Sequence, residues 1–288
     1  MTGLVLEGGA LRASFTSGVM DAFWDNGILF PYVIGVSAGI SNAYSYVNGQ
    51  RGRNDEILKC YRADPRYLSY GNFLKRKCVM DLQFVFEEIP QKLLPYDYEA
   101  LANYSGRIIA AITERESARA EYYDQRDCDA GFRLLQATCA LPVAFPAIEF
   151  QGKFYVDGGV ADPIPIRRAI ADGCTKNVVV MTKREGYRKH LGKGDKLAAR
   201  LYQKRYPALA QAVLTRPARY NEEVEFCLAQ EREGRAIVLW SDYADTIGRF
   251  EKSYENIHKL YENGYEKAIA RMADIRAMLG EDNQFIGK

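Results

Sequence analysis

This 288-residue sequence has few histidines and no paired cysteine motif. His190 and His258 are its two histidines, and none of its six cysteines forms a Cys-x-x-Cys pair, which excludes the usual zinc and redox motifs. It also lacks a run of about 18 apolar residues, the length a membrane-spanning helix needs. Its first residues lack the basic and apolar segments of a secretory signal. We therefore expect free thiols in a reducing compartment and a cytoplasmic protein.

The sequence also has no large excess of either charge: 39 Lys and Arg are nearly balanced by 37 Asp and Glu, which leaves a net charge of +2. This balance gives no argument for a nucleic-acid partner. Residues 183–219 are an exception, with eleven basic and two acidic residues. A solvated helical face is one interpretation of that run. The other is peripheral contact with the anionic inner surface of a membrane.

Short apolar runs alternate with helical patterns along the chain. The runs at 4–6 and 32–36 each lead through a tight turn into apolar residues at helical spacing. Two such units predict a βαβ arrangement and hence an α/β fold with a parallel sheet covered by helices. Further strands are expected at 107–113, 120–123, 153–156, 177–182 and 235–240, and helices at 130–140, 166–172 and 249–279.

Residues 51–105 have a different character, being aromatic, basic and weakly periodic. We interpret them as an insertion over one end of the sheet. No repeat, low-complexity tract or linker divides the chain. The expected organisation is a core at 3–182, followed by residues 183–288. That second part comprises the basic segment, a further strand and a C-terminal helical region, packed on the same domain.

A nucleophile elbow is predicted at Gly35-Val36-Ser37-Ala38-Gly39. This Gly-x-Ser-x-Gly motif lies between an apolar strand and a helical pattern, which is the context such an elbow requires. The turn is so sharp that small residues must flank the serine. A chance match in a loop is the alternative interpretation.

The base that would activate Ser37 is not evidently a histidine. Neither histidine follows a strand end or a turn, and the elbow comes too early in the chain for an α/β-hydrolase. A carboxylate is the remaining choice. Asp157-Gly158-Gly159, directly after the strand at 153–156, is the best-placed candidate. The alternative is that Asp157 has only a structural role in a turn.

A glycine-rich loop, Glu7 to Arg12, joins the first strand to the first helix. Such a loop presents backbone N–H groups to an anion. Dinucleotide binding is disfavoured because Gly-x-Gly-x-x-Gly is not matched. An oxyanion hole formed by Gly8, Gly9 and Ala10 is the better interpretation.

Together the three motifs resemble those of the patatin-like phospholipases. That family has a Gly-Gly-Gly-x-Arg-Gly loop, a Gly-x-Ser-x-Gly elbow and a later Asp-Gly-Gly or Asp-Gly-Ala, which correspond in the same order to residues 8–13, 35–39 and 157–159. The segments 140–146 and 157–165 are similar to the surroundings of the family's aspartate. The resemblance covers about residues 3–182, and the last hundred residues look like the tail of a bacterial branch.

The resemblance implies a patatin-like three-layer fold with a central, mostly parallel sheet flanked by helices. It also implies a serine acyl hydrolase, of phospholipase or lysophospholipase type, that cleaves lipid carboxylic esters without a cofactor or metal. Ser37 would be the nucleophile and Asp157 the general base. The supporting motif residues would be Arg12, Gly35, Gly39, Gly158 and Gly159.

The oxyanion loop departs from the family pattern, because Ala10 and Ala13 stand where the family has glycine. A positive φ at Ala10 would cost roughly 1–2 kcal/mol. This departure favours an alternative, a non-catalytic patatin-fold protein that binds a lipid or a partner. Hydrolysis of a non-lipid ester would use the same residues. The sequence carries no signal for oligomeric state.

Overall fold

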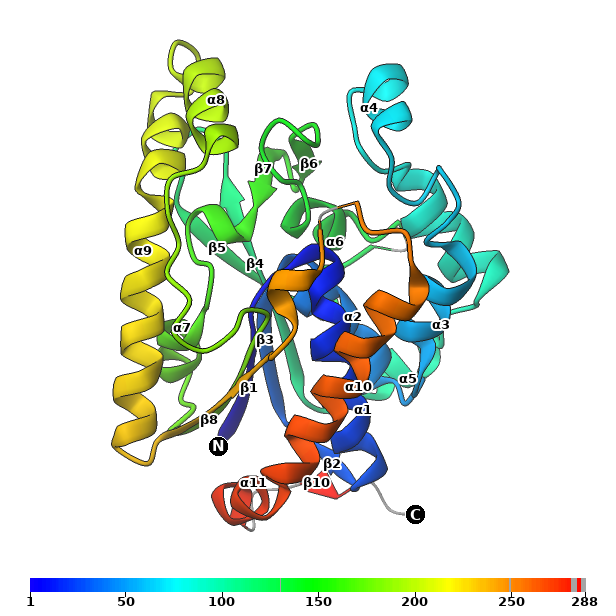
Figure 1. Ribbon diagram of the computed structural model, residues 1–288, viewed down its shortest axis with the longest axis vertical. Coiled ribbons are helices and arrows are strands. Elements are labelled where there is room, and N and C mark those ends of the chain that lie inside the picture. The colour runs from blue at the N-terminus through cyan, green and yellow to red at the C-terminus, as the bar shows by residue number, and fades with distance from the viewer. Residues whose placement is uncertain (130, 249, 281–283, 286–288) are drawn as a thin grey trace.

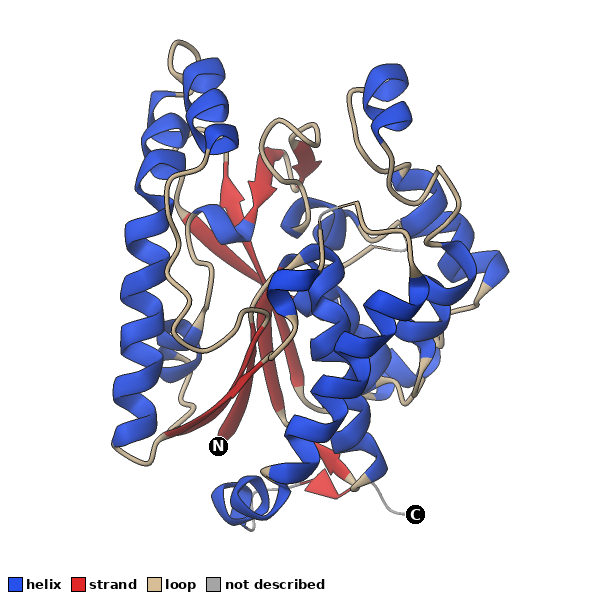
Figure 2. Cartoon of the chain, viewed as in Figure 1, coloured by secondary structure: helices blue, strands red, loops and turns tan. Residues whose placement is uncertain are grey.

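A central eight-stranded sheet separates two layers of helices (Figures 1 and 2). The computed structural model describes residues 1–129, 131–248, 250–280 and 284–285. The strands run in the order β6-β7-β4-β3-β1-β8-β9, and β5 pairs with β4. The strands are β1 (Thr2–Leu6), β2 (Ile28–Leu29), β3 (Tyr32–Val36), β4 (Arg107–Glu114), β5 (Ala120–Asp124), β6 (Ile148–Phe150), β7 (Lys153–Asp157), β8 (Lys176–Met181), β9 (Ala236–Trp240) and β10 (Gln284–Phe285).

The middle of the sheet is parallel. Strand β1 lies between β3 and β8, and β4 and β9 continue the parallel arrangement on either side. Antiparallel pairing is confined to β5, β6 and β7 within this sheet and to a separate pair of β2 with β10. The expected α/β class with a mostly parallel sheet is confirmed.

Alternate residues of the central strands pack into two apolar cores, one on each face of the sheet. Leu4 and Leu6 of β1 point to one face, where helices α1 (Ser14–Asp25) and α2 (Ser37–Val47) pack. Val5 points to the other face, where α7 (Ile166–Ala171) and α9 (Pro207–Arg232) pack. All three side chains are fully buried. Burial on both faces explains why these strands are apolar runs rather than alternating patterns.

Helices cover both faces and extend beyond the carboxyl edge of the sheet. The helical elements before β4 are η1 (Ala10–Ala13), α1 (Ser14–Asp25), α2 (Ser37–Val47), α3 (Arg53–Tyr61), α4 (Tyr70–Arg76), a π-helix η2 (Phe84–Leu93) and α5 (Tyr98–Asn103). Those after it are η3 (Gln125–Asp127), α6 (Arg133–Thr138), η4 (Gly158–Val160), α7 (Ile166–Ala171), α8 (Lys193–Tyr202), α9 (Pro207–Arg232), η5 (Ala244–Thr246), α10 (Tyr254–Ala270) and α11 (Met272–Leu279).

The C-terminal part of the chain packs directly on the first helix. A Cβ placed on Gly18 of α1 would lie 1.9 Å from the carbonyl oxygen of Tyr261, and one on Gly264 of α10 would lie 2.0 Å from that of Phe15. Two glycines therefore allow the backbones of α1 and α10 to touch. Strand β9 also extends the main sheet through β8. The boundary near residue 182 stays a prediction.

Several elements differ from the pattern expected from the sequence. The segment 51–105 contains α3, α4, η2 and α5, which its weak periodicity did not predict, and α8 and α9 were not foreseen. Helix α9 carries Pro217 in its interior and has little amphipathic periodicity, so its 26 residues gave no clear signal. The expected helices at 130–140 and 249–279 correspond to α6 and to α10 with α11; residues 130 and 249 lie outside the described residues.

Candidate active site

Ser37 lies at a sharp turn between β3 and α2. Its φ of +55° is in the left-handed region, which a non-glycine residue adopts only under strain. A Cβ on Gly39 would lie 2.4 Å from the carbonyl oxygen of Glu7, and one on Gly35 would lie 2.8 Å from the Cβ of Leu6. The spacing of the motif therefore follows from the close approach of the first strand.

Thr138, at the end of α6, fixes the start of α2. Its Oγ1 accepts the backbone N–H of Ser37 at 2.9 Å and donates to the carbonyl of Ala111 at 2.7 Å. One buried hydroxyl thus ties the serine turn to β4. The N–H groups that follow in the first turn of α2 have no helical partner and carry the positive end of the helix dipole. Sequence reasoning missed Thr138, because nothing near it marks a contact 101 residues away.

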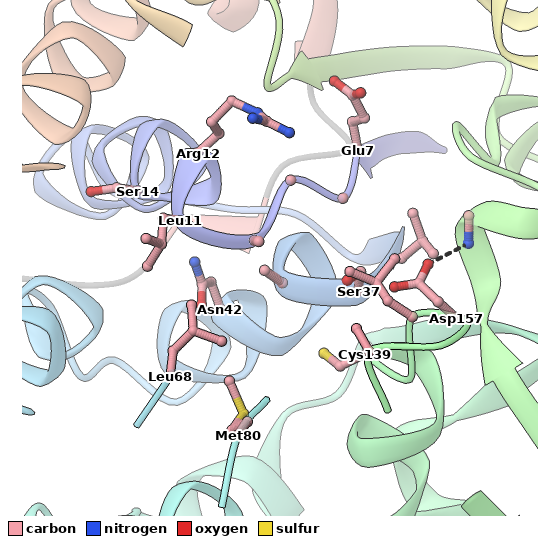
Figure 3. A pocket seen from close by; sticks show the side chains of 18 of the residues that line it. Glu7, Leu11, Arg12, Ser14, Ser37, Asn42, Leu68, Met80, Cys139 and Asp157 are labelled. Atoms are coloured by element: carbon pink, nitrogen blue, oxygen red, sulfur yellow. Dashed lines mark hydrogen bonds between the residues drawn. The ribbon is translucent and has the colours of Figure 1, made fainter. Parts of the chain in front are cut away.

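Asp157 ends β7 beside Ser37 (Figure 3). Its Oδ1 accepts the N–H of Gly159 at 2.8 Å. Its Oδ2 is buried and has no hydrogen-bond partner in the described part of the chain. Burial raises the pKa of Asp157, and Arg216, the Gly159 N–H and the Ser37 side chain oppose that rise. The carboxylate therefore keeps one oxygen for a neighbouring proton.

The glycine-rich loop after β1 lies directly over the serine. A Cβ on Gly8 would come within 2.9 Å of the Ser37 Cβ. In the hydrogen bonds among the described residues, the backbone N–H groups of Gly8, Gly9 and Ala10 are not donors. Ala10 has a φ of +50°, so the strained conformation considered from the sequence is present. The loop thus lies against the serine turn, and its three backbone amides donate no hydrogen bond among the described residues.

One cavity of about 280 Å³ joins these elements. The polar part of its wall includes Ser37 and Asp157, and Figure 3 shows Leu11, Leu68 and Met80 on the opposite side. Its apolar lining includes Leu11, Ile57, Leu58, Tyr67, Leu68, Val79, Met80, Leu141, Ala144, Phe145 and Phe250. The 51–105 segment therefore contributes mainly aliphatic residues to the wall. Of its aromatic residues, Phe84 and Phe86 are buried in the fold and only Tyr67 lines the cavity.

Three basic residues, Lys183, Lys189 and Arg216, also line the cavity. Arg216 of α9 donates its Nε hydrogen to the carbonyl of Gly159 at 2.7 Å, which joins it to the Asp157 turn. All three belong to the basic run 183–219, but the sequence did not show that they face the same cavity as Ser37. Arg12 lines it too, and its buried Nε has no partner within the described residues.

A model of the patatin-like phospholipase family matches residues 4–170, more than half of the chain. The chain belongs to the patatin-like phospholipase family. By family it is thus related to lipid-ester hydrolases, and the expected fold class agrees with its sheet and helix layers. A second model, of a domain of unknown function (DUF6363), matches residues 206–280.

Two individual proteins are similar to this patatin-like chain. The uncharacterized protein YjjU of Escherichia coli strain K12 is 27% identical over 182 residues, which is 62% of this chain and 51% of that protein. The match thus spans about half of that relative's length. The crystal structure of VipD from Legionella pneumophila aligns with a TM-score of 0.47 and 14% identity, over 94% of this chain and 66% of that one.

Neither histidine of this patatin-like chain lines the cavity. His190 is exposed, whereas His258 is partly buried on α10 and pairs through Nδ1 with Asp55 at 3.0 Å. The six cysteines are free, as expected, with Cys60 exposed. Cys139 lines the cavity, and burial raises the pKa of its thiol to about 12, so the thiolate is not available as a nucleophile. No helix within the described ranges has the length and apolar character needed to cross a bilayer.

Proposed function

We propose that this protein is a serine acyl hydrolase of phospholipase or lysophospholipase type that cleaves lipid carboxylic esters through Ser37 and Asp157. One observation carries the proposal: the unpartnered, buried Oδ2 of Asp157 beside the strained Ser37 turn. A serine hydroxyl needs a neighbouring base to become a nucleophile. The raised pKa of Asp157 makes its carboxylate a stronger base than an exposed aspartate.

In the first step the Ser37 oxygen attacks the ester carbonyl carbon while its proton passes to Asp157. The tetrahedral intermediate collapses, the acyl group stays on Ser37, and the leaving alcohol takes the proton from Asp157. A water molecule then gives its proton to Asp157 and attacks the acyl-serine. The fatty acid leaves and Ser37 regains the proton. No group beyond water is consumed.

The negative oxygen of each intermediate would be stabilised by the amides of Gly8, Gly9 and Ala10. These N–H groups have no competing acceptor among the described residues, and the loop contacts the serine turn. Removal of one such donor typically costs about 3 kcal/mol of transition-state stabilisation. Gly9 is the N-cap of η1 and Ala10 is its first residue, so their amides lie at a helix start.

The rest of the cavity fits an acyl chain, because its wall opposite Asp157 is aliphatic and aromatic. Two helices that project past the carboxyl edge of the sheet suit a lipid surface (Figure 1). On α8, Leu197 and Leu201 are 52% and 59% exposed, and on α4, Leu74 is 77% exposed. Basic residues flank these leucines. We propose that the 183–219 segment contacts anionic membrane through α8.

The decisive experiment pairs a fluorophosphonate probe with turnover of p-nitrophenyl butyrate and a lysophospholipid. We expect labelling of Ser37, and Ser37→Ala should lose labelling and lower turnover by at least about 1000-fold. Asp157→Asn should lose turnover to a similar extent while remaining folded. The exposed His190→Ala variant is the matched control and should stay within about twofold of the wild type.

Two results would reject the proposal. The first is normal turnover in Ser37→Ala, and the second is an unlabelled Ser37 in a wild-type protein that hydrolyses none of the substrates. The second result would point instead to a non-catalytic lipid-binding protein. Loss of activity in His258→Ala without loss of folding would require a different base.

A further inference from the structure

The turn that carries Asp157 is held by a part of the chain that lies outside the match to the patatin-like family model. That match ends at residue 170, whereas the model of a domain of unknown function covers residues 206–280. Helix α9 is the first element of this second region, and it packs beside the turn. Two separately matched regions of the chain therefore meet at Asp157.

Apolar contacts bring α9 to the turn. Val156 and Val160, on either side of the turn, are fully buried in one apolar cluster with Leu209 and Val213 of α9. Arg216 follows Val213 by three residues and therefore lies on the same side of the helix. The packing of this cluster thus places Arg216 next to the main chain of the turn.

All four carbonyl oxygens of residues 157–160 face a side-chain donor. The hydroxyl of Thr113 on β4 lies 2.9 and 3.3 Å from the first two of these oxygens. Arg216 and Arg219 of α9 donate to the third and the fourth, each at 2.7 Å. The sheet therefore holds one half of the turn, and α9 holds the other half.

Arg216 reaches the carboxylate through Gly159. The carbonyl of Gly159 accepts the Arg216 Nε hydrogen, and its N–H donates to Oδ1 of Asp157 at 2.8 Å. A Cβ on Gly159 would lie 3.0 Å from that Oδ1 and 3.3 Å from Nη2 of Arg216. The guanidinium and the carboxylate thus border one small space, and Oδ2 keeps no hydrogen-bond partner within the described ranges.

The guanidinium also acts on the charge of the carboxylate. The groups that face Asp157 are Arg216, Lys189, the side chains of Ser37 and Cys139 and the Gly159 amide. Burial raises the pKa of Asp157, and Arg216 opposes that rise most strongly. Arg219 acts elsewhere, because its charge lowers the pKa of Asp162 against the effect of burial.

We propose that Arg216 is a positioning residue, which fixes the Asp157 carboxylate through Gly159 and keeps its Oδ2 toward Ser37. The region of unknown function thereby supplies part of the active site. This inference rests on the proposed hydrolysis, in which Asp157 is the base, and it assigns a role to α9 that the hydrolysis alone does not require. Arg219 supports the same turn but does not act on the base.

The pH dependence of kcat/KM for p-nitrophenyl butyrate tests the charge of Arg216. Arg216→Gln removes a cation that favours the ionised carboxylate, so activity should be lost on acidification with a midpoint about one pH unit higher than in the wild type. Arg219→Gln removes the same charge and the same type of contact from the neighbouring carbonyl and should leave the midpoint in place. An unmoved midpoint in Arg216→Gln, or equal shifts in both variants, would overturn the proposal.

The contact with Gly159 is tested at pH 8, where the carboxylate is ionised. Arg216→Gln should lower kcat at least about tenfold and change KM less than about twofold, because a small neutral ester does not need the guanidinium for binding. Arg216→Lys keeps the charge but loses the planar donor, so it should retain the wild-type midpoint and still lower kcat several-fold. A wild-type kcat in Arg216→Gln, or a shifted midpoint in Arg216→Lys, would contradict the positioning role.

Arg232→Gln is the matched control for these variants. Arg232 is exposed at the end of the same helix, about 24 Å along its axis from Arg216. Its replacement removes one positive charge from α9 and should keep kcat within about twofold and the midpoint unchanged. A midpoint that rises as much as in Arg216→Gln would mean that net charge, rather than the contact at Gly159, moves it. Thermal melting checks that each variant is folded, and Arg216→Lys carries the kcat test if the glutamine variant does not fold.

NMR of the Asp157 carboxyl carbon separates this proposal from the hydrolase proposal. In protein labelled with ¹³C at aspartate Cγ, the signal is identified by its loss in Asp157→Asn. Its titration midpoint should be about one pH unit higher in Arg216→Gln and unchanged in Arg219→Gln. If no ester is hydrolysed in a Ser37-dependent manner, the hydrolase proposal fails, and this titration still decides whether Arg216 acts on Asp157. Equal midpoints in the wild type and Arg216→Gln would overturn the inference.

Discussion

Thr138 accepts the backbone N–H of Ser37 at 2.9 Å while donating its own hydrogen to the carbonyl of Ala111 at 2.7 Å. The side chain of Thr138 is fully buried, so both partners depend on it. It connects the turn that carries the serine to β4, which also pairs with the strand that ends at Asp157. The hydroxyl group of Thr138 thus adds a buried side-chain link between the Ser37 turn and the strand pair that places Asp157.

Thr138→Val should therefore impair both stability and turnover. Valine has nearly the same shape but leaves two buried backbone groups unpaired, which costs about 1–3 kcal/mol for each group. We expect a lower free energy of unfolding in urea and at least about a tenfold lower kcat. Thr138→Ser keeps the hydroxyl and should recover most of the kcat. Equal kcat values for the valine and serine variants would contradict this positioning role.

Asp157→Asn should be inactive yet more stable than the wild type at neutral pH. The folded state raises the pKa of Asp157, so it binds this proton more readily than the unfolded chain. Stability is thus highest below the unfolded pKa and decreases as pH rises through the folded one. Asparagine carries no charge and avoids that loss. Each kcal/mol recovered would raise Tm by about 2–4 °C. A lower Tm in Asp157→Asn at pH 8 would contradict the expectation.

The loss of kcat/KM on acidification should have its midpoint at a higher pH than the pKa of an ordinary aspartate. Asp157 must be ionised to accept the serine proton, and burial raises its pKa. We expect kcat/KM for p-nitrophenyl butyrate to fall on acidification with a midpoint above about 4. Glu223 is a suitable control, because burial raises its pKa to about 7 but it does not line the cavity. Glu223→Gln should leave the midpoint in place, whereas a shifted midpoint would assign the loss of activity to Glu223.

Ala10→Gly should stabilise the protein slightly and preserve turnover. Glycine removes roughly 1–2 kcal/mol of strain at a φ of +50° but adds about 0.4–1 kcal/mol of unfolded-state entropy. The expected net gain in unfolding free energy lies between about 0 and 1.6 kcal/mol. Ala118, with a φ of +55° and outside the cavity, is the matched control. Ala10→Val should be destabilised and less active, and a fully active valine variant would argue against a role for this amide.

Replacing the exposed leucines of α8 should weaken membrane attachment. Leu197 and Leu201 are one turn apart beside basic residues. We expect Leu197→Ser with Leu201→Ser to lower binding to phosphatidylglycerol vesicles at least about tenfold, since both side chains would lose apolar contact. Ile269→Ser, near the C-terminal end of α10, should have little effect, because α10 leads there into α11 at the end of the molecule away from α8 (Figure 1). Vesicle co-sedimentation at low and high salt separates the electrostatic contribution to binding from the apolar one. Unchanged binding of the leucine double variant would reject α8 as the membrane-contacting surface.

The order of strands and turns near the serine could be predicted from local sequence. An apolar run, a Gly-x-Ser-x-Gly turn and a helical pattern specify a strand–turn–helix unit wherever they occur. The strand and the turn at Asp157 were also recognisable, because glycines after an aspartate mark a tight turn. These signals depend on neighbours within about ten residues, so they can be recognised without knowledge of the rest of the fold.

The role of Thr138 and the placement of the basic side chains were decided only by the tertiary structure, because both depend on contacts between distant segments. Thr138 looks like any helical threonine until β4 and α2 meet around it. The basic run 183–219 has its charges in the sequence, but the path of α8 and α9 divides them: Lys196 and Arg200 face solvent, while Lys189 and Arg216 face the cavity. Local periodicity fixes the type of an element, whereas packing fixes which side chains meet, because burial and charge pairing are properties of the assembled chain.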